Sequence, residues 1–177
     1  MTAPTLHPAH APGAPHAAPK GVAILGSTGS IGTTALRVLA RQAERYRVVA
    51  LTAHSNAALL AEQARLFGPG YVGLVGNGHG TAGAAPEWRT GGDCLVEAAT
   101  RPDADVVLNA VVGAAGLDAT LAALRAGKRV ALANKETLVV AGELAYAAAR
   151  EGGGELVPVD SEHSAILQCI AGRPGQE

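Results

Sequence analysis

Short aliphatic runs alternate with segments of helical periodicity from Lys20 onward. The runs are predicted to be strands because they are continuous in apolar residues and bounded by glycine or polar residues. The segments between them carry apolar residues three or four apart, as amphipathic helices do. This alternation predicts an α/β fold, a doubly wound and mostly parallel sheet with helices on both faces. The expected strands are residues 21–26, 47–54, 71–75, 104–113, 129–134 and 154–160, and residues 76–92 are expected to be a glycine-rich loop.

Residues 1–19, MTAPTLHPAHAPGAPHAAP, precede the first expected strand. They hold five of the ten prolines and three of the six histidines. Because proline at this density opposes both helices and sheet ladders, we expect a disordered extension rich in proline, alanine and histidine.

The composition excludes several classes of function. A net charge of -1 and 3% aromatic residues provide neither a basic surface nor stacking platforms, so no nucleic-acid partner is expected. No apolar window is long enough for a membrane span, so no membrane partner is expected. Cys94 and Cys169 have no CxxC or Cys/His spacing, which argues against a zinc site or a disulfide framework. A cytoplasmic location is the expectation.

The motif GSTGSIG lies between the first expected strand and the helix that follows it. It places Gly26, Gly29 and Gly32 three apart, where a backbone without side chains can turn tightly and admit a pyrophosphate to a helix N-terminus. Thr28 and Ser30 add hydroxyl donors. A plain structural turn explains many glycine triplets, but the position in the first strand–helix unit favours a Rossmann-like dinucleotide site.

The second expected strand ends in Thr52 and Ala53, followed by His54, Ser55 and Asn56. An acidic residue there would bind the ribose 2′-hydroxyl of NAD and repel a 2′-phosphate. Since no acid is present, NADP is favoured, with neutral donors at His54, Ser55 and Asn56. These three residues can also simply turn the chain and cap the next helix, and both interpretations can hold together.

LANKETLV, residues 132–139, stands where the fifth expected strand ends, at the edge where open α/β sheets bind ligands. Lys135 can hold a phosphate or a polarised oxygen, and Asn134 can fix a nicotinamide or ribose group. The alternative makes Asn134 a helix cap, with Glu136 stabilised by the helix dipole.

VPVDSEHSAI, residues 157–166, concentrates charge that is sparse elsewhere in the chain. In an extended segment the side chains of Asp160 and Glu162 share a face, so both carboxylates can converge on one Mg²⁺ or Mn²⁺ ion. His163 need not be a ligand. The alternative is a solvated helix start, with Asp160 or Ser161 as its cap.

GSTGSIG, GAAGL (113–117), LANKETLV and VPVDSEHSAI occur in an order and spacing similar to that of 1-deoxy-D-xylulose 5-phosphate reductoisomerases. The resemblance runs from about Gly21 to the end of the chain. It implies an enzyme of the non-mevalonate isoprenoid pathway that isomerises 1-deoxy-D-xylulose 5-phosphate and reduces it to 2-C-methyl-D-erythritol 4-phosphate. NADPH and Mg²⁺ or Mn²⁺, or else Co²⁺, are the implied cofactors, and a homodimer is the implied full-length assembly.

The resemblance also implies roles for single residues. The implied cofactor phosphate contacts are Thr28, Gly29, Ser30 and Ile31, and the contacts near the reacting end of NADPH are Asn134 and Glu136. Lys135 is the implied substrate-binding and catalytic lysine. Asp160 and Glu162 are the implied metal ligands, with Ser161 and Glu162 also binding substrate and Glu162 taking part in catalysis. His54 and Ser55 stand where the family has glycine and a basic residue, so a weaker or differently built 2′-phosphate site is expected.

On this resemblance, residues 20–157 form an NADPH-binding Rossmann-like domain and residues 158–177 begin a truncated catalytic domain. We expect an N-terminal fragment that holds NADPH and is inactive alone, since the family draws further metal and substrate groups from beyond Glu177. Two alternatives are a stand-alone nucleotide-binding module and a homoserine-dehydrogenase-like oxidoreductase. The second explains the dinucleotide-binding half but not the Asp160–Glu162 cluster.

Overall fold

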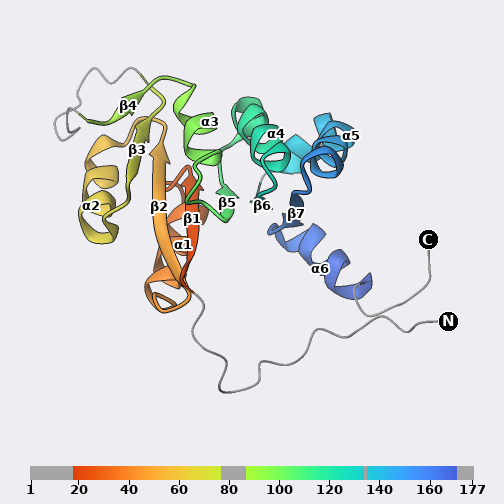
Figure 1. Cartoon of the computed structure of the whole chain (residues 1–177), viewed down its shortest axis with the longest axis horizontal. Coiled ribbons are helices and arrows are strands. Elements are labelled where there is room, and N and C mark those ends of the chain that lie inside the picture. Colours follow the sequence, from red (N-terminus) through yellow and green to blue (C-terminus); the bar gives the residue numbers. More distant parts are fainter. Residues whose placement is uncertain (1–17, 77–86, 134, 171–177) are drawn as a thin grey trace.

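The computed structural model describes residues 18–76, 87–133 and 135–170. These residues form a seven-stranded sheet with the order β4-β3-β2-β1-β5-β6-β7, in which every paired strand is parallel to its neighbour (Figure 1). The expectation of a doubly wound, mostly parallel sheet is confirmed. The strands are β1 (Lys20–Leu25), β2 (Tyr46–Ala53), β3 (Tyr71–Leu74), β4 (Arg89–Thr90), β5 (Val106–Asn109), β6 (Arg129–Leu132) and β7 (Glu155–Pro158).

Helices cover both faces of this sheet, as the strand composition predicts. The helical elements are α1 (Ser30–Ala40), α2 (Ala57–Phe67), α3 (Cys94–Ala99), η1 (Gly113–Gly116, a 3-10 turn), α4 (Leu117–Arg125), α5 (Lys135–Gly152) and α6 (Ser161–Ile170). One core cluster joins the sheet to α1 and α2, and a second joins it to α3, α4 and α5. Along β1, Ala23 and Leu25 enter the α3–α5 cluster whereas Val22 and Ile24 enter the other, as the alternation of a strand requires.

The centre of the sheet is where the direction of winding reverses. Strand β1 pairs with β2 on one side and with β5 on the other, so β2, β3 and β4 extend one way from β1 and β5, β6 and β7 extend the other. The loops that follow β1 and β5 therefore diverge from a common point at the carboxyl edge. Crevices of this kind are the usual ligand sites of open α/β sheets.

Strand β4 was not expected, because it lies within the segment 76–92 assigned to a loop. Arg89 pairs with Gly73, and Thr90 pairs with Leu74, at the end of the sheet. Both β4 residues are exposed, and a two-residue edge strand needs no apolar run, which is why the hydrophobic pattern did not reveal it. Residues 77–86 of the same segment lie outside the described residues.

Candidate functional site

A cavity of about 380 Å³ opens at the carboxyl edge of the sheet, where the strand order reverses between β1 and β5. Its walls come from the loop after β1, the end of β2, the residue after β3, the start of α3 and the loop after β5. The lining residues are Gly26, Thr28, Gly29, Thr52, Ala53, His54, Val75, Leu95, Ala110, Val111, Val112 and Ala115. This cavity is the candidate functional site.

Two of the three glycines in GSTGSIG are required by close packing. Gly26 has a φ of 82°, and a methyl group there would lie 2.8 Å from the Ala110 carbonyl oxygen. A methyl group at Gly32 would lie 2.4 Å from the Gly26 oxygen and 2.6 Å from Ser27 Cα. The loop therefore packs closely against Ala110, the residue after β5, on one side and against the first turn of α1 on the other.

Gly29 has a different role from the other two glycines. A methyl group at Gly29 would meet nothing nearer than the Gly26 oxygen, at 3.5 Å, and its φ is an ordinary −77°. Gly29 is exposed, lines the cavity and precedes α1 with no side-chain cap. Packing does not demand glycine here, and the missing side chain leaves the N-terminal N–H groups of α1 open to an anion.

Buried hydrogen bonds hold the root of the glycine loop. The Thr52 carbonyl oxygen accepts from Gly26 N at 3.0 Å and from Ser27 N at 2.8 Å. Ser27 Oγ donates to Gln63 Oε1 at 2.7 Å, and Gln63 Nε2 donates to the Ser27 carbonyl oxygen at 3.0 Å. Ser27 and Thr52 have no exposed surface, whereas Gly29 is exposed. The loop thus has a fixed root and an open tip.

The predicted phosphate contacts lie on that open tip. Thr28 and Gly29 line the cavity, and Ser30 and Ile31 are exposed in the first turn of α1. The four residues are contiguous and surround one helix N-terminus. Their contact with a cofactor stays a prediction.

The opposite wall is fixed by a buried amide. Asn109, at the end of β5, donates from Nδ2 to the Gly116 carbonyl oxygen at 3.0 Å and to Thr120 Oγ1 at 2.8 Å. Its Oδ1 accepts from Val111 N at 3.1 Å. Asn109 and Thr120 have no exposed surface. These bonds shape the loop that carries Ala110, Val111 and Ala115 against the cavity.

Sequence reasoning did not single out Ser27, Gln63, Asn109 or Thr120. A signal was available for Gln63, because it continues the buried positions Ala57 and Leu60 of α2 at intervals of three. A polar residue on an apolar helix face implies a buried partner. The partner itself lies 36 positions away, which no local pattern reveals.

The segment after β2 has the geometry of a helix start. Asn56 precedes α2, and its Oδ1 accepts from Leu59 N at 3.1 Å, so the capping role is confirmed for this residue. His54 and Ser55 are exposed, and His54 lines the cavity. Cofactor contacts of His54, Ser55 and Asn56 stay predictions.

The LANKETLV motif spans the junction of β6 and α5. Leu132 ends β6, and α5 begins at Lys135 on the same edge of the sheet as the cavity. Asn134 lies outside the described residues, as do the side chains of Lys135 and Glu136. Their proposed roles therefore stay predictions.

The expectation that Asp160 and Glu162 lie in one extended segment is wrong. Strand β7 ends at Pro158 and α6 begins at Ser161, so Asp160 precedes a helix and Glu162 lies in its first turn. Ser161 Oγ donates to Glu162 Oε2 at 3.0 Å, and both residues are exposed. Short polar and acidic residues favour this position because they interact with the free N–H groups of a helix start.

The two carboxylates are nevertheless within one turn of each other, on the carboxyl side of β7. Within the part of the chain that the structure describes, no three His, Cys, Asp or Glu side chains gather as a metal-binding group. Asp160 and Glu162 would therefore supply part of a coordination shell, with other oxygen ligands completing it.

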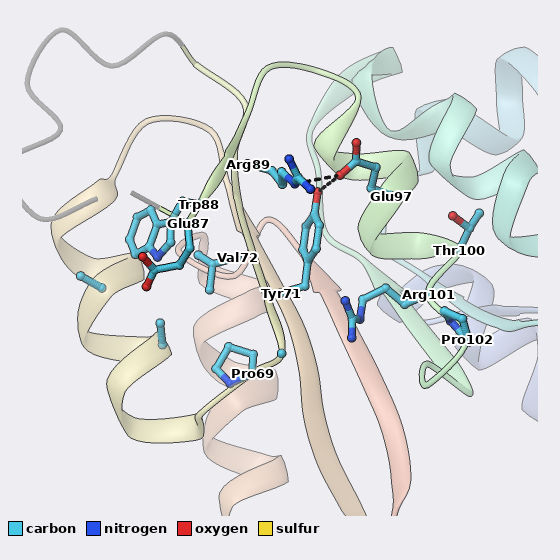
Figure 2. Close-up of a pocket in the computed structure, with 13 residues that line it drawn as sticks. Pro69, Tyr71, Val72, Glu87, Trp88, Arg89, Glu97, Thr100, Arg101 and Pro102 are labelled. Carbon is cyan, nitrogen blue, oxygen red and sulfur yellow. Dashed lines mark hydrogen bonds and ion pairs between the residues drawn. The ribbon is translucent and has the colours of Figure 1, made fainter. Parts of the chain in front are cut away.

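A larger cavity of about 950 Å³ lies at the other end of β3, around Tyr71 (Figure 2). The Tyr71 hydroxyl donates to Glu97 Oε2 at 2.8 Å, and the Cys94 carbonyl oxygen is a second acceptor within reach, at 3.2 Å. Arg89 Nε lies 3.9 Å from the same Glu97 oxygen. Arg101 stacks 5.7 Å from the centre of the Tyr71 ring. These polar groups already interact with one another, which favours a structural role.

The titrating groups near Tyr71 are also poorly suited to catalysis. Burial, reinforced by the bond to Glu97, raises the pKa of Tyr71 above its ordinary value. Burial beside Glu97 likewise raises the pKa of the Cys94 thiol to about 11. Phenol and thiol are both neutral at physiological pH, so neither is an activated nucleophile.

Comparison with known proteins shows to which family the chain is similar. A family model described as 1-deoxy-D-xylulose 5-phosphate reductoisomerase matches residues 22–142, a range that includes the lining of both cavities. The reductoisomerase of Symbiobacterium thermophilum is 52% identical over 163 residues, covering 86% of this chain and 42% of the relative.

Solved structures of reductoisomerases have the same fold. The enzyme of Zymomonas mobilis in complex with NADPH is 47% identical, with a TM-score of 0.77 over 85% of this chain and 41% of that one. Another, in complex with NADPH, fosmidomycin and magnesium, is 41% identical, with a TM-score of 0.78 over 85% of this chain and 38% of that one. The chain spans about two fifths of the length of these relatives.

No helix among the described residues has both the length and the apolar character needed to cross a bilayer.

Proposed function

Because the chain belongs to the 1-deoxy-D-xylulose 5-phosphate reductoisomerase family, we propose that it provides the NADPH-binding part of an enzyme with that activity. The enzyme isomerises 1-deoxy-D-xylulose 5-phosphate and reduces it to 2-C-methyl-D-erythritol 4-phosphate. The observation that carries the proposal is the cavity at the winding reversal, bounded by GSTGSIG on one side and the Asn109 loop on the other. Family membership replaces the homoserine-dehydrogenase-like alternative.

The glycine loop would bind the pyrophosphate. Thr28 and Ser30 carry hydroxyl donors, Gly29 admits the phosphate oxygens, and the N-terminus of α1 faces them with its partial positive charge. Ile31 is 48% exposed beside this loop and would cover an apolar part of the cofactor. Complexes of related reductoisomerases with NADPH support this assignment.

The other end of the cofactor would meet the LANKETLV junction. Asn134 and Glu136 would orient the nicotinamide end, and Lys135 would place a positive charge on a substrate phosphate or oxygen. Their position at the carboxyl edge, after β6, supports this assignment. Because β1 and β6 belong to one sheet, the two loops that follow them would hold the phosphate end and the reacting end of the cofactor in a fixed orientation, as hydride transfer requires.

The helix start after β7 would hold a divalent cation. Asp160 and Glu162 carry hard carboxylate oxygens, which fit Mg²⁺ or Mn²⁺, with Co²⁺ as a further option. When bound, such a cation supplies positive charge that polarises a ketone oxygen. Ser161 and Glu162 would also bind substrate, and Glu162 would hold or release a proton there. The magnesium complex of a related enzyme supports the choice of metal.

Homodimeric assembly of the full-length enzyme and a cytoplasmic location are further parts of the proposal, both supported by the family resemblance.

Fluorescence titration with NADPH and NADH tests the cofactor assignment. We expect tighter binding of NADPH, because Thr52–Asn56 contain no acid to repel a 2′-phosphate. Gly29→Val should abolish binding of both by filling the anion site, whereas Gly142→Ala, with nothing within 4 Å of the added methyl group, should bind normally. Equal affinities or a preference for NADH would contradict the assignment. Titration of Mn²⁺ with the ketose phosphate present separates this proposal from a bare nucleotide-binding module.

A further inference from the structure

We propose that Gln63 is a positioning residue that holds the glycine loop in the shape needed to bind the cofactor. The inference rests on the proposed function, because it concerns the same cavity. Gln63 lies on α2 and has 7% of its surface exposed, so it touches the root of the loop and not its open tip.

The contact between Gln63 and Ser27 is bidentate. The amide accepts from Ser27 Oγ at 2.7 Å and donates to the Ser27 carbonyl oxygen at 3.0 Å. Ser27 N is held by the Thr52 carbonyl oxygen at 2.8 Å. The N–H, the carbonyl and the hydroxyl of this buried residue therefore all have partners. A residue held in this way has no freedom to rotate its peptide planes.

The geometry links two halves of the cofactor site. Ser27 lies directly before the predicted phosphate contacts Thr28–Ile31, and Gln63 lies on the helix that begins after His54–Asn56. Asn56 caps that helix through Leu59 N. Gln63 is two turns further along, roughly 10 Å from the cap. It therefore sets the pyrophosphate loop at a fixed distance from the segment expected to hold the 2′-phosphate.

Gln63 is placed to do more than fill space. The other buried positions of α2 are Ala57 and Leu60. An apolar side chain at position 63 would continue this buried face and would avoid the free-energy cost of removing the Gln63 amide from water. A buried polar pair between segments 36 positions apart instead selects one arrangement of loop and helix. Preorganisation of this kind raises ligand affinity by reducing the ordering needed on binding.

The test compares Gln63→Met, Ser27→Ala and the double variant, made in the full chain, with Gln42→Met as the matched control. Gln42 is an exposed glutamine in the turn after α1, outside the cavity. Kd values for NADPH and NADH are measured by fluorescence. Amide hydrogen exchange of residues 26–31 is measured in the cofactor-free proteins.

Gln63→Met should raise both Kd values by about tenfold, equivalent to about 1.4 kcal/mol, and leave the NADPH to NADH ratio unchanged because both cofactors share the pyrophosphate. Exchange should accelerate at residues 26–31 and not in the central strands. Since Ser27 and Gln63 act as one unit, the double variant should be no more than about twofold weaker than Gln63→Met. Gln42→Met should match the parent.

An unchanged Kd in Gln63→Met with unchanged loop exchange would overturn the inference. Exchange that accelerates equally across the sheet would also overturn it, because it would show general destabilisation. If Gln63→Met does not fold, Ser27→Ala takes its place, because it removes the hydroxyl bond to Gln63 and keeps the bond from Gln63 Nε2 to the carbonyl oxygen of residue 27. The same changes in Kd and in exchange of residues 26–31 then decide the inference. If the parent binds neither cofactor, the proposed function fails, and loop exchange alone then supports or refutes the positioning role.

Discussion

Gly32→Ala is the substitution whose effect follows most directly from the packing of the glycine loop. The added methyl group would lie 2.4 Å from the Gly26 oxygen, 2.6 Å from Ser27 Cα and 2.7 Å from the Ser27 carbonyl carbon. These are backbone atoms and cannot rotate away, so loop and helix must separate. Overpacking of this kind costs about 1–3 kcal/mol. The replacement of glycine within a helix returns up to about 1 kcal/mol.

The two contributions leave a net loss of stability of about 0–3 kcal/mol for Gly32→Ala; because the clash is with backbone atoms, we expect about 1–2 kcal/mol, or a fall in Tm of about 2–8 °C for a chain of this size. Gly29→Ala is the contrasting variant, because its methyl group meets only the Gly26 oxygen at 3.5 Å. Its stability should stay within about 0.5 kcal/mol of the parent. Gly142→Ala, beside the kink at Ala141 in α5 and with nothing within 4 Å of the added methyl group, controls for the added methyl group without a packing clash.

The assay is urea unfolding followed by circular dichroism, with NADPH titration on the same preparations. Gly32→Ala should lose stability, whereas Gly29→Ala should keep its stability and lose affinity. Gly32→Ala that is as stable as the parent would refute the reasoning, since it would mean that the loop does not press against α1.

Three further predictions concern other parts of the chain. Asn109→Leu should lower the free energy of unfolding by about 1–3 kcal/mol, because it removes two buried hydrogen bonds and one that is partly buried; a loss in urea unfolding below about 0.5 kcal/mol would argue against the network. The hydrogen bond from Arg101 lowers the pKa of Asp103 in the folded chain. The pair therefore stabilises the fold fully above the pKa of an unfolded Asp, about 3.9, and this stabilisation is lost as the pH falls through the lower pKa of Asp103 in the folded chain. The stability difference between the parent and Asp103→Asn should therefore shrink in acid unfolding curves below about pH 4, and a constant difference would contradict the pairing. Asp160→Asn should weaken Mn²⁺ binding in calorimetry without altering Tm, whereas a large fall in Tm would show that Asp160 is structural.

The hydrophobic pattern predicted the sheet because its central strands are buried on both faces. Val22–Leu25 and Val48–Ala53 are buried throughout, so their sequences read as unbroken apolar runs. The pattern could not find β4, whose two residues are exposed. The sequence also suggested an extended segment at residues 160–162 where α6 begins, because Asp160–Glu162 suits an extended metal-binding segment and a helix start equally well by composition.

The candidate site was predictable where its residues are local in sequence. GSTGSIG identifies its own turn, since the glycine spacing and the flanking strand and helix lie within one short segment. Gln63 and Asn109 were not found, because their roles depend on which backbone groups tertiary packing brings to them. A polar residue on a buried face shows that a partner exists but not which one.

The pairing of β1 with β5 sets an order of events during folding. Strand β1 meets β2 through contacts such as Gly26 with Thr52, 26 positions apart, whereas Gly21 and Asp105 are 84 positions apart. Closing the longer loop has the larger entropic penalty and slows the step that depends on it. On a ribosome the β1–β2 pair can form while β5 is still being synthesised. The cavity is lined by residues from both sides of β1, so a dinucleotide bound there, as proposed, would stabilise the chain only after β5 has docked and would not assist the earlier steps.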